Sequence, residues 1–571
     1  MKAVSLFGVL VVAHLLMLAG HSVPLSPWTL AAYFWQDLLI ALVFGAVDHL
    51  TKRPALGWTL YAILVAYSAI NVPIARILSS PLTWTMMRAA RGPLSDSIRF
   101  YITVQNVGAV LLVIMAGFLF PWFLSRKKYR IRPPLVLAAI IVTALGPLAT
   151  TQLETSGLHR NAYGVLWPTR LQRTGLMNGN NWRTPPFSTD STPGALKKYR
   201  GAAAGRNVIL IALESTAAQY LALYGASPDP MPNLTELAEH AIVFESAYTV
   251  YPESIKGLLT VLCSRYPAFQ TDAEAYANIA CPSLAQLLAE SGYRTALFHS
   301  GRFMYLGMES VVKNRGFETL EDAGAIGGNV DSSFGVDEPA AVERIFKWID
   351  SLPKDQPFFL AYLPVAGHHP YATPSPGPFP AETDLGNYLN ALHYGDQSLG
   401  TLLRGLRERK LERNTLFVLY GDHGEAFGQH EGNRGHSMFI YDENVRVPLM
   451  IAAPGLIQGE VRALQTASLI DMEPTILDLL GHPIPSQLQG SSLLDSPNNM
   501  ALFFTDYSLG FLGLYDACWK YILETDSGRS KLFDTCRDPA ETTDLTAKEP
   551  ARIKAYRDGL QHWIGAQELR R

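Results

Sequence analysis

The chain has 571 residues, which is too long for one ordinary domain, and its net charge is only −3. So small a charge gives no reason to expect nucleic acid as a partner. Hydrophobic residues make up 48% of the chain, but they are unevenly distributed. The part before residue 153 is dense in Leu, Val, Ala, Ile and Phe, whereas the remainder resembles ordinary globular sequence.

Five apolar segments follow one another in this first part. Each is close to the ~20 residues that a helix needs to cross a bilayer. One such segment alone is also consistent with a buried core helix or, for the first, a cleaved signal peptide. Five in succession favour a transmembrane helical domain over residues 1–152, with spans at 4–19, 30–47, 56–74, 104–124 and 134–149.

Basic residues indicate the orientation of these spans. Residues 52–53 and the loop 126–132 are rich in Lys and Arg, and such loops stay on the cytoplasmic side. The loop between them also carries three arginines, which weakens this assignment. A cytoplasmic N-terminus with five crossings places everything after residue 152 outside the membrane.

Four cysteines lie beyond the apolar segments. An even number there suits an oxidising compartment, although four free thiols in a cytoplasmic domain are the alternative. Three connectivities are possible, and we predict the local pairs Cys263–Cys281 and Cys518–Cys536. No CxxC spacing occurs, which argues against a cysteine zinc site.

Residues 153–205 have a different composition, rich in Arg, Asn, Thr, Pro and Gly. We interpret them as a juxtamembrane linker. Trp167 and Trp182 either sit at the lipid headgroups or belong to a solvated tether, and the sequence leaves both open.

From residue 206 onward, apolar runs alternate with helical patterns. This order predicts an α/β domain over 206–571 with a largely parallel central sheet and a small C-terminal subdomain from about 499. The ligand site of such a sheet lies beyond the carboxyl ends of its strands. The expected strands are 208–213, 295–299, 358–365, 415–420, 447–452 and 501–505, and the expected helices are 233–240, 283–291, 340–351 and 388–407.

Metal-binding side chains follow two of these strands. Glu214 directly follows the apolar run 207–213, and Asp422 and His423 follow the run 415–420 after one glycine. Taken alone, Glu214 is better explained as a helix N-cap, but Asp422 and His423 at the equivalent place favour a ligand. Because parallel strands end at the same edge of a sheet, we expect the three side chains to hold one divalent metal ion.

Ser254 is the candidate nucleophile. Pro252 interrupts the chain, and an apolar helical stretch begins near Ile255, so Ser254 lies at a helix N-terminus. Free amides and the helix dipole favour anions there, and a hydroxyl bound to a metal can attack phosphorus. The alternative is that Ser254 merely caps the helix.

Further histidines follow the strands. His368 comes directly after the strand 358–365, His436 lies 13 residues beyond His423, and His299 ends the strand 295–299. Histidines there can bind phosphate oxygens, hold a second metal or protonate a leaving group. The residues alone leave these roles open, and His299 is a candidate on weaker grounds.

These motifs resemble the alkaline phosphatase/sulfatase superfamily, and more narrowly its membrane-anchored branch of lipoteichoic acid synthases and lipid A phosphoethanolamine transferases. The similarity covers residues 206–490, with weaker features in 515–545, and five spans before the catalytic domain match that branch's layout. The motifs are Asn-Val-Ile-Leu-Ile-Ala-Leu-Glu-Ser (207–215), Gly-Asp-His-Gly-Glu (421–425), the helix 388–396 and the block 435–449.

The resemblance implies a metal site formed by Glu214, Asp422, His423 and the nucleophile. It also implies that His368 and His436 contact the transferred phosphoryl group or a second metal. Zinc or manganese suits such ligands best, and magnesium or calcium remains open. These transferases usually use Thr as the nucleophile, whereas this chain offers Ser254, with Thr249 as the alternative. The implied activity moves a phosphoglycerol or phosphoethanolamine head group from a membrane phospholipid to a glycan or lipid acceptor, at the outer side of a bacterial inner membrane.

Two other functions remain open. A membrane-anchored sulfatase or phosphodiesterase would use the same site with water as the acceptor. However, the Cys/Ser-x-Pro-x-Arg motif of formylglycine sulfatases matches neither the sequence at 254–257 nor that at 263–267. The third possibility, a non-catalytic membrane scaffold, is disfavoured because the metal-binding and nucleophile positions are intact.

Overall fold

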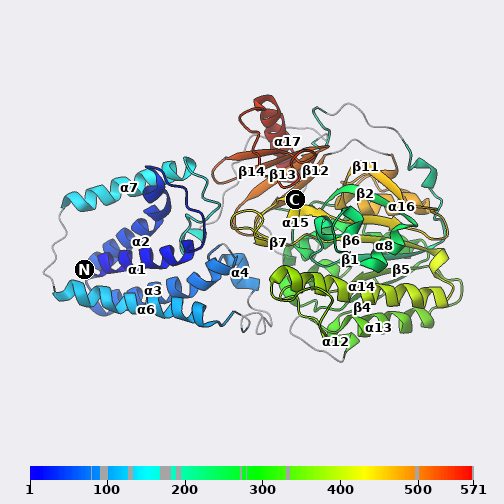
Figure 1. The fold of residues 1–571 in the computed structure, drawn as a ribbon, viewed down its shortest axis with the longest axis horizontal. Coiled ribbons are helices and arrows are strands. Elements are labelled where there is room, and N and C mark those ends of the chain that lie inside the picture. The colour runs from blue at the N-terminus through cyan, green and yellow to red at the C-terminus, as the bar shows by residue number, and fades with distance from the viewer. Residues whose placement is uncertain are drawn as a thin grey trace.

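The structure, a computed structural model, divides into a helical bundle (1–151) and an α/β domain (206–568) that lie side by side (Figure 1). The described residues are 1–78, 80–89, 99, 101–126, 133–166, 182–187, 194–269, 273–277, 279–328, 335–495 and 500–568. Trp167 and the basic residues 127–132 lie outside this set.

The bundle consists of apolar helices packed against one another. Helix α1 contacts α2, α3 and α6, while α7 packs on α2. Among the described residues, α2, α3, α6 and α7 are long and apolar enough to cross a membrane, whereas α1 has only 17 residues, so the five-span expectation is borne out for four helices. The helices are α1 (Lys2–Leu18), α2 (Thr29–Thr51), α3 (Pro54–Leu78), α4 (Trp84–Ala89), α6 (Val104–Arg126) and α7 (Pro133–Thr151).

A nine-stranded sheet forms the centre of the α/β domain. Parallel pairs predominate, but β10 runs antiparallel to both of its neighbours, and β9 pairs antiparallel with β2. The main path runs β11 (Val461–Ser468), β2 (Ala241–Tyr248), β10 (Leu449–Ala452), β6 (Thr415–Gly421), β1 (Asn207–Leu213), β5 (Phe358–Leu363), β3 (Arg294–His299) and β4 (Thr319–Glu321), with β9 (Arg446–Val447) beside it.

Helices cover both faces of this sheet, which explains why its central strands are continuously apolar. In β1 every residue is buried, and alternate side chains enter two separate cores. One core includes α9 (Ser254–Cys263), α10 (Leu284–Glu290), α11 (Met308–Val312) and α16 (Met472–Leu480). The other includes α8 (Pro232–Ala238), α13 (Glu338–Ser351) and α14 (Asp384–Glu408).

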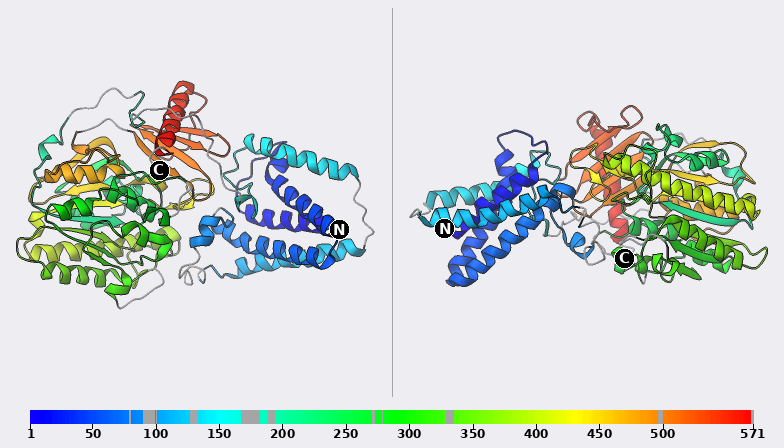
Figure 2. Two further views of the ribbon diagram at one scale, coloured as in Figure 1. Left: turned by 180° about the vertical axis from the view of Figure 1, so that it is seen from behind. Right: turned by 60° about the horizontal axis from the view of Figure 1, so that its bottom comes forward.

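A second, antiparallel sheet lies toward the C-terminus, next to the helical bundle (Figure 2). Its strands occur in chain order, and α17 contacts two of them. The strands are β12 (Ala501–Thr505), β13 (Phe511–Asp516), β14 (Trp519–Glu524) and β15 (Ser530–Asp534), and α17 is Pro550–Glu568. The remaining short elements are α12 (Ala323–Ile326), α15 (Asp442–Val445), β7 (Ala426–Phe427) and β8 (Arg434–Gly435).

The predicted strands and helices are found with shifts of a few residues at their ends, except that the predicted strand 447–452 is divided into β9 and β10. Both predicted disulfides, Cys263–Cys281 and Cys518–Cys536, are present. The expectation for Trp182 was wrong. Its ring is buried in the core beneath the C-terminal sheet, and it is therefore available neither to lipid headgroups nor to a solvated tether.

Candidate metal and nucleophile site

The metal-binding corner forms where two central strands end together. Strands β1 and β6 pair in parallel, with Leu213 opposite Gly421, so the residues that follow them meet at the carboxyl edge of the sheet. There the backbone amide of Ser215 donates to Asp422 Oδ1 at 3.0 Å. This register brings Glu214 and Asp422 together, as their positions after the strands predicted.

Glu214, Asp422 and His423 are all buried, and one ligand atom from each lies within 4.8 Å of the other two. His423 Nε2 is 3.6 Å from Glu214 Oε1 and 3.5 Å from Asp422 Oδ2. The other ring nitrogen of His423 hydrogen-bonds to the carbonyl of Gly424 at 2.9 Å, which leaves Nε2 to face the carboxylates. Two carboxylates and an imidazole in this arrangement are a suitable ligand set for a divalent cation.

The electrostatics of the corner also suit a cation. Burial, together with the Asp422 carboxylate, raises the pKa of Glu214 to about 8. Burial alone would lower the pKa of His423, but the carboxylates of Asp422 and Glu214 outweigh it and raise this pKa. Ionising Glu214 beside Asp422 and out of water is therefore unfavourable, and a bound positive ion would favour the charged carboxylates.

Ser254 faces this corner from the first turn of α9. Its hydroxyl donates to Glu214 Oε2 at 3.3 Å and lies 3.2 Å from His423 Nε2. The cap of the helix is Glu253, whose carboxylate accepts from the amides of Ile255 and Lys256. Ser254 is thus free of the capping role, and it is partly exposed where the three candidate ligands are buried.

Thr249, the alternative nucleophile, lies in a different environment. It has no solvent exposure, and its hydroxyl donates to the carbonyl of Tyr251 at 3.2 Å. A substrate cannot reach it without rearrangement of the chain, so the geometry favours Ser254.

Comparisons with known proteins agree with this architecture. Residues 206–482 match the Sulfatase family model. The α/β domain is therefore similar to sulfatases over these residues. Its curated relatives include both arylsulfatases and lipoteichoic acid synthases.

Arylsulfatase K from Bos taurus is 30% identical over 36% of this chain and 42% of its own length. Lipoteichoic acid synthase 2 from Bacillus subtilis is 25% identical over 54% of this chain and 50% of its own length. The chain thus spans half or less of the curated relatives that it matches.

Solved structures show the same fold at low sequence identity. The lipoteichoic acid synthase LtaP from Listeria monocytogenes superposes with a TM-score of 0.52 at 21% identity, covering 67% of this chain and 96% of its own. A 2-O GAG sulfatase gives 0.52 at 18% identity, with 64% and 92% covered.

Beside this corner the structure places His436, which was expected, and Glu425, which was not assigned a role. His436 Nδ1 bonds to Glu425 Oε2 at 2.8 Å, and the rings of His436 and His423 stack with centroids 4.0 Å apart. His423, Glu425 and His436 form a second group of adjacent ligand atoms. Burial tends to raise the pKa of Glu425, but His436 reverses this and lowers it.

The other two histidines lie at neighbouring strand ends. Burial, reinforced by His436, lowers the pKa of His368 to about 4, so this ring is neutral at physiological pH. Burial also lowers the pKa of His299, whose Nδ1 bonds to the carbonyl of Leu363 at 2.8 Å. Both rings therefore suit hydrogen bonding better than positive charge.

Sequence reasoning overlooked the residues that support this site. Glu425 belongs to the Gly-Asp-His-Gly-Glu motif, and Tyr371, whose hydroxyl donates to Glu425 Oε1 at 2.5 Å, follows the His-His-Pro motif. Their positions within or next to these two motifs could have marked them as candidates, but no spacing rule predicts that Tyr371 and Glu425 form a hydrogen bond.

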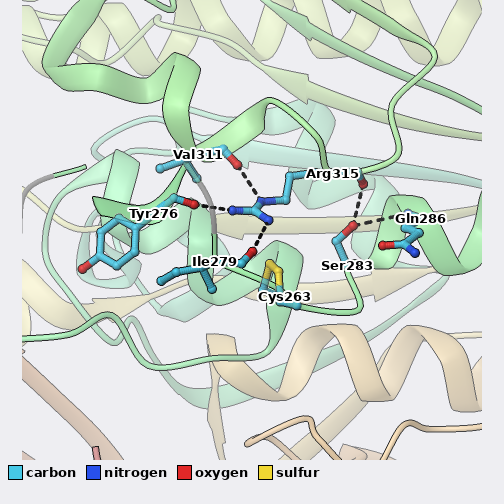
Figure 3. The surroundings of a disulfide bond; sticks show 8 residues. Cys263, Tyr276, Ile279, Ser283, Gln286, Val311 and Arg315 are labelled. Atoms are coloured by element: carbon cyan, nitrogen blue, oxygen red, sulfur yellow. Dashed lines mark hydrogen bonds between the residues drawn. A yellow bond between two sulfur atoms is a disulfide. The ribbon is translucent and has the colours of Figure 1, made fainter. Parts of the chain in front are cut away.

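The far end of α9 is also anchored (Figure 3). Cys263, the last residue of the helix, is disulfide-bonded to Cys281. Beside this bond the guanidinium of Arg315 donates to the carbonyls of Tyr276, Ile279 and Val311 at 2.6, 2.7 and 3.0 Å. Both ends of the helix that carries Ser254 are thus held.

Proposed function

We propose that this protein is a metal-dependent transferase that moves a phosphoglycerol or phosphoethanolamine head group from a membrane phospholipid to a glycan or lipid acceptor of the bacterial cell envelope. The observation that carries this proposal is the Ser254 hydroxyl, partly exposed and within 3.3 Å of both Glu214 and His423. The α/β domain would act at the outer face of the inner membrane.

The residues present fit a divalent metal ion. Glu214, Asp422 and His423 offer two carboxylates and an imidazole, with one ligand atom of each lying within 4.8 Å of the others. The Ser254 hydroxyl supplies a further oxygen. A bound cation would supply positive charge that favours the ionised Ser254 hydroxyl and neutralises phosphoryl oxygens. Zinc or manganese suits the mixed ligand set best.

The chemistry assigned to the chain has two displacements. In the first, Ser254 Oγ loses its proton and bonds to phosphorus while the bond from phosphorus to the diacylglycerol oxygen breaks, and that oxygen takes up a proton. In the second, an acceptor hydroxyl loses its proton and attacks phosphorus, and Ser254 leaves and is reprotonated. His368 and His436 are assigned to hold the oxygens of the phosphoryl group.

A lipid donor is supported by the helical bundle. Four helices are long and apolar enough for a membrane, and the lipoteichoic acid synthases of Bacillus subtilis are among the relatives. An enzyme anchored in this way reaches a lipid-linked phosphodiester without having to extract it from the bilayer.

The alternative is a membrane-anchored hydrolase of sulfuric or phosphoric esters, supported by the similarity to arylsulfatase K. The formylglycine route is disfavoured, because the only cysteine of α9, Cys263, is its last residue and is disulfide-bonded. A phosphodiesterase that uses water as the acceptor needs no change in the site.

The test uses the full chain in nanodiscs that contain phosphatidylglycerol or phosphatidylethanolamine. We expect manganese- or zinc-dependent release of diacylglycerol, its loss in Ser254→Ala and on metal chelation, and near-normal rates in the matched control Thr249→Ser. Intact-protein mass spectrometry should find the head-group phosphate on Ser254.

Two outcomes would contradict the proposal. Sulfate release from aryl sulfates without any phospholipid turnover would reject the transferase, and unchanged activity of Ser254→Ala would reject the nucleophile. A metal-free, inactive protein would favour the scaffold function.

A further inference from the structure

The edge of the site faces the helical bundle. Three segments that follow strands of the central sheet contact it: the 3-10 turn Tyr305–Gly307 contacts α4, β8 contacts α3, and Glu431 Oε1 bonds to His21 Nδ1 at 2.8 Å. Figure 1 shows α4 at the end of the bundle nearest the α/β domain. The loops that carry the candidate histidines are thus next to the part of the protein assigned to the membrane.

One residue of the bundle reaches the histidine loop itself. Tyr101 lies three residues before α6, and its hydroxyl is 2.7 Å from His369 Nε2. The two rings are nearly parallel, with an interplanar angle of 6° and centroids 5.5 Å apart. Burial raises the pKa of Tyr101 to about 12, so the phenol keeps its proton in this hydrogen bond.

From His369 a continuous set of contacts leads to the metal corner. The His369 ring packs edge-on against Tyr371 at 5.3 Å, and the Tyr371 hydroxyl donates to Glu425. Glu425 in turn holds His436, whose ring stacks on His423. Each contact fixes the orientation of the next side chain, and His368 precedes His369 in the chain.

We propose that Tyr101 is a positioning residue of the catalytic site, supplied by the helical bundle, and that the site is fully assembled only when the bundle is docked on the α/β domain. This rests on the proposed function for the identity of the substrate. The contact geometry, however, is independent of whether that substrate is a phospholipid or a sulfate ester.

This role explains why a membrane segment contacts that loop. A site that is assembled by residues from beside the bilayer would turn over lipid-linked substrate efficiently only with the bundle in place. The competing explanation is that Tyr101–His369 is one of several docking contacts without influence on the chemistry. Glu154, which pairs with Lys531 elsewhere in the same junction, provides the matched control.

The experiment uses the full chain in phosphatidylglycerol nanodiscs with the variants Tyr101→Phe, Tyr101→Ala and Glu154→Gln. A small displacement of catalytic groups costs about tenfold or more in rate, so we expect Tyr101→Ala to lower kcat by about tenfold with little change in KM. Tyr101→Phe, which keeps the stacked ring, should retain an intermediate kcat, and Glu154→Gln should match the wild type.

A second readout does not depend on activity. Diethyl pyrocarbonate modifies accessible imidazoles, and peptide mass spectrometry measures its rate at each histidine. His369 should react faster in both Tyr101 variants, whereas the exposed His240 should be unaffected. This measurement remains valid if phospholipid is not the substrate, in which case an aryl sulfate or aryl phosphodiester replaces it in the kinetic assay.

Unchanged His369 reactivity in Tyr101→Ala would overturn the contact, and equal losses of kcat in Tyr101→Phe and Glu154→Gln would overturn the positioning role. A third outcome separates the two proposals. If the wild type does not turn over phospholipid but His369 becomes more reactive in the Tyr101 variants, only the proposed substrate is rejected.

Discussion

Ser254 is available for chemistry because its neighbour Glu253 performs the capping. A serine at the start of a helix usually accepts a hydrogen bond from a backbone amide, and that use would turn its hydroxyl away from the metal corner. Here the Glu253 carboxylate accepts from two amides, and the Ser254 hydroxyl points to Glu214 and His423 instead. Glu253 thus caps the helix, and the Ser254 hydroxyl is left for the proposed chemistry.

We predict that Glu253→Ala weakens both stability and turnover. Loss of a helix cap costs about 0.5–2 kcal/mol, and the loosened first turn should lower kcat by about tenfold because Ser254 loses its fixed position. Thermal melting of the full chain and phospholipid turnover would measure the two effects. Glu253→Gln, which keeps an acceptor oxygen, should lie between wild type and Glu253→Ala, and an unchanged kcat in Glu253→Ala would contradict the prediction.

For individual residues, the sequence predicts a contact where the position of each residue along a strand determines that contact. Glu214 and Asp422 meet because parallel strands share an edge, which the apolar runs before them already indicate. The pairing of Tyr371 with Glu425 across 54 residues depends on how two loops fold, and no periodic pattern encodes it. The roles of Ser254, His368, His436 and His299 remain predictions.

Among the elements, α9 is held at both ends. The disulfide at its far end has a counterpart of the same loop length in the C-terminal sheet. Cys263–Cys281 and Cys518–Cys536 each join residues 18 apart in the sequence. The first ends on the helix of Ser254, whereas the second begins just before β14 and closes the hairpin of the C-terminal sheet. Comparing the two disulfides therefore distinguishes their shared effect on the entropy of the unfolded chain from an effect on the candidate site, which only Cys263–Cys281 can have.

We predict that removing either disulfide by double Cys→Ala substitution costs about 3 kcal/mol, because both close loops of the same length in the unfolded chain. Only the Cys263/Cys281 variant should also lose turnover below its melting temperature, since its helix positions the nucleophile. Melting curves and kcat at a low temperature would test this. Equal kcat values in the two double variants would show that the anchored end of α9 is irrelevant to the chemistry.

The segment that follows α7 gives a pH-dependent prediction. Burial, with help from Arg160, lowers the pKa of His159 to about 3, and its Nδ1 lies 2.7 Å from the Thr155 hydroxyl. The folded protein therefore keeps His159 neutral, whereas in the unfolded chain the pKa of His159 returns to about 6.5. Its contribution to stability is complete above that pH and is lost as the pH falls toward 3, at about 1.4 kcal/mol per pH unit.

The melting temperature of the wild type should consequently fall between pH 7 and pH 5, and His159→Gln should flatten this dependence. The exposed His240 supplies the control, because His240→Gln should retain the wild-type slope. If both variants keep that slope, His159 is not the group responsible.

Element types were predictable where apolar runs were long, as in β1 and β6, which are buried over their full length. Strand β2 was missed because it directly follows α8 and contains Glu245 and Ser246, which interrupt its apolar pattern. In both cases burial determines whether the strand can be predicted, since only strands covered on two faces have an uninterrupted run of apolar residues.

For the whole molecule, the arrangement of the two parts could not be inferred from the sequence. Tyr101 and His369 are 268 residues apart, and neither lies in a patterned segment that implies contact. The same holds for the segment after α7, where Arg160 donates to the carbonyl of Ser508 at 2.9 Å. Contacts of this kind depend on the docking of two separately folded surfaces, which hydrophobic periodicity does not report.

The bundle itself leaves one question of topology, which concerns α1. With 17 residues it extends about 26 Å, slightly less than the ~30 Å hydrocarbon core. Its first residues nevertheless lie beside the far end of α2, where Lys2 Nζ pairs with Asp48 Oδ1 at 2.6 Å, and His21 beyond its other end bonds to Glu431 of the α/β domain. Helix α1 therefore extends from one end of the bundle to the other, which favours a fifth crossing.

Single added thiols can test this topology, because all four native cysteines are in disulfides and the chain has no other free thiol. With five crossings and a cytoplasmic N-terminus, a membrane-impermeant maleimide should label Ser22→Cys in intact spheroplasts but should leave Val4→Cys and Ser125→Cys unlabelled until the membrane is permeabilised. Four crossings would expose Val4→Cys together with Ser22→Cys, since α1 would then lie outside. Labelling of Ser125→Cys in intact spheroplasts would instead reverse the orientation and place the α/β domain in the cytoplasm, where neither disulfides nor an envelope acceptor would be expected.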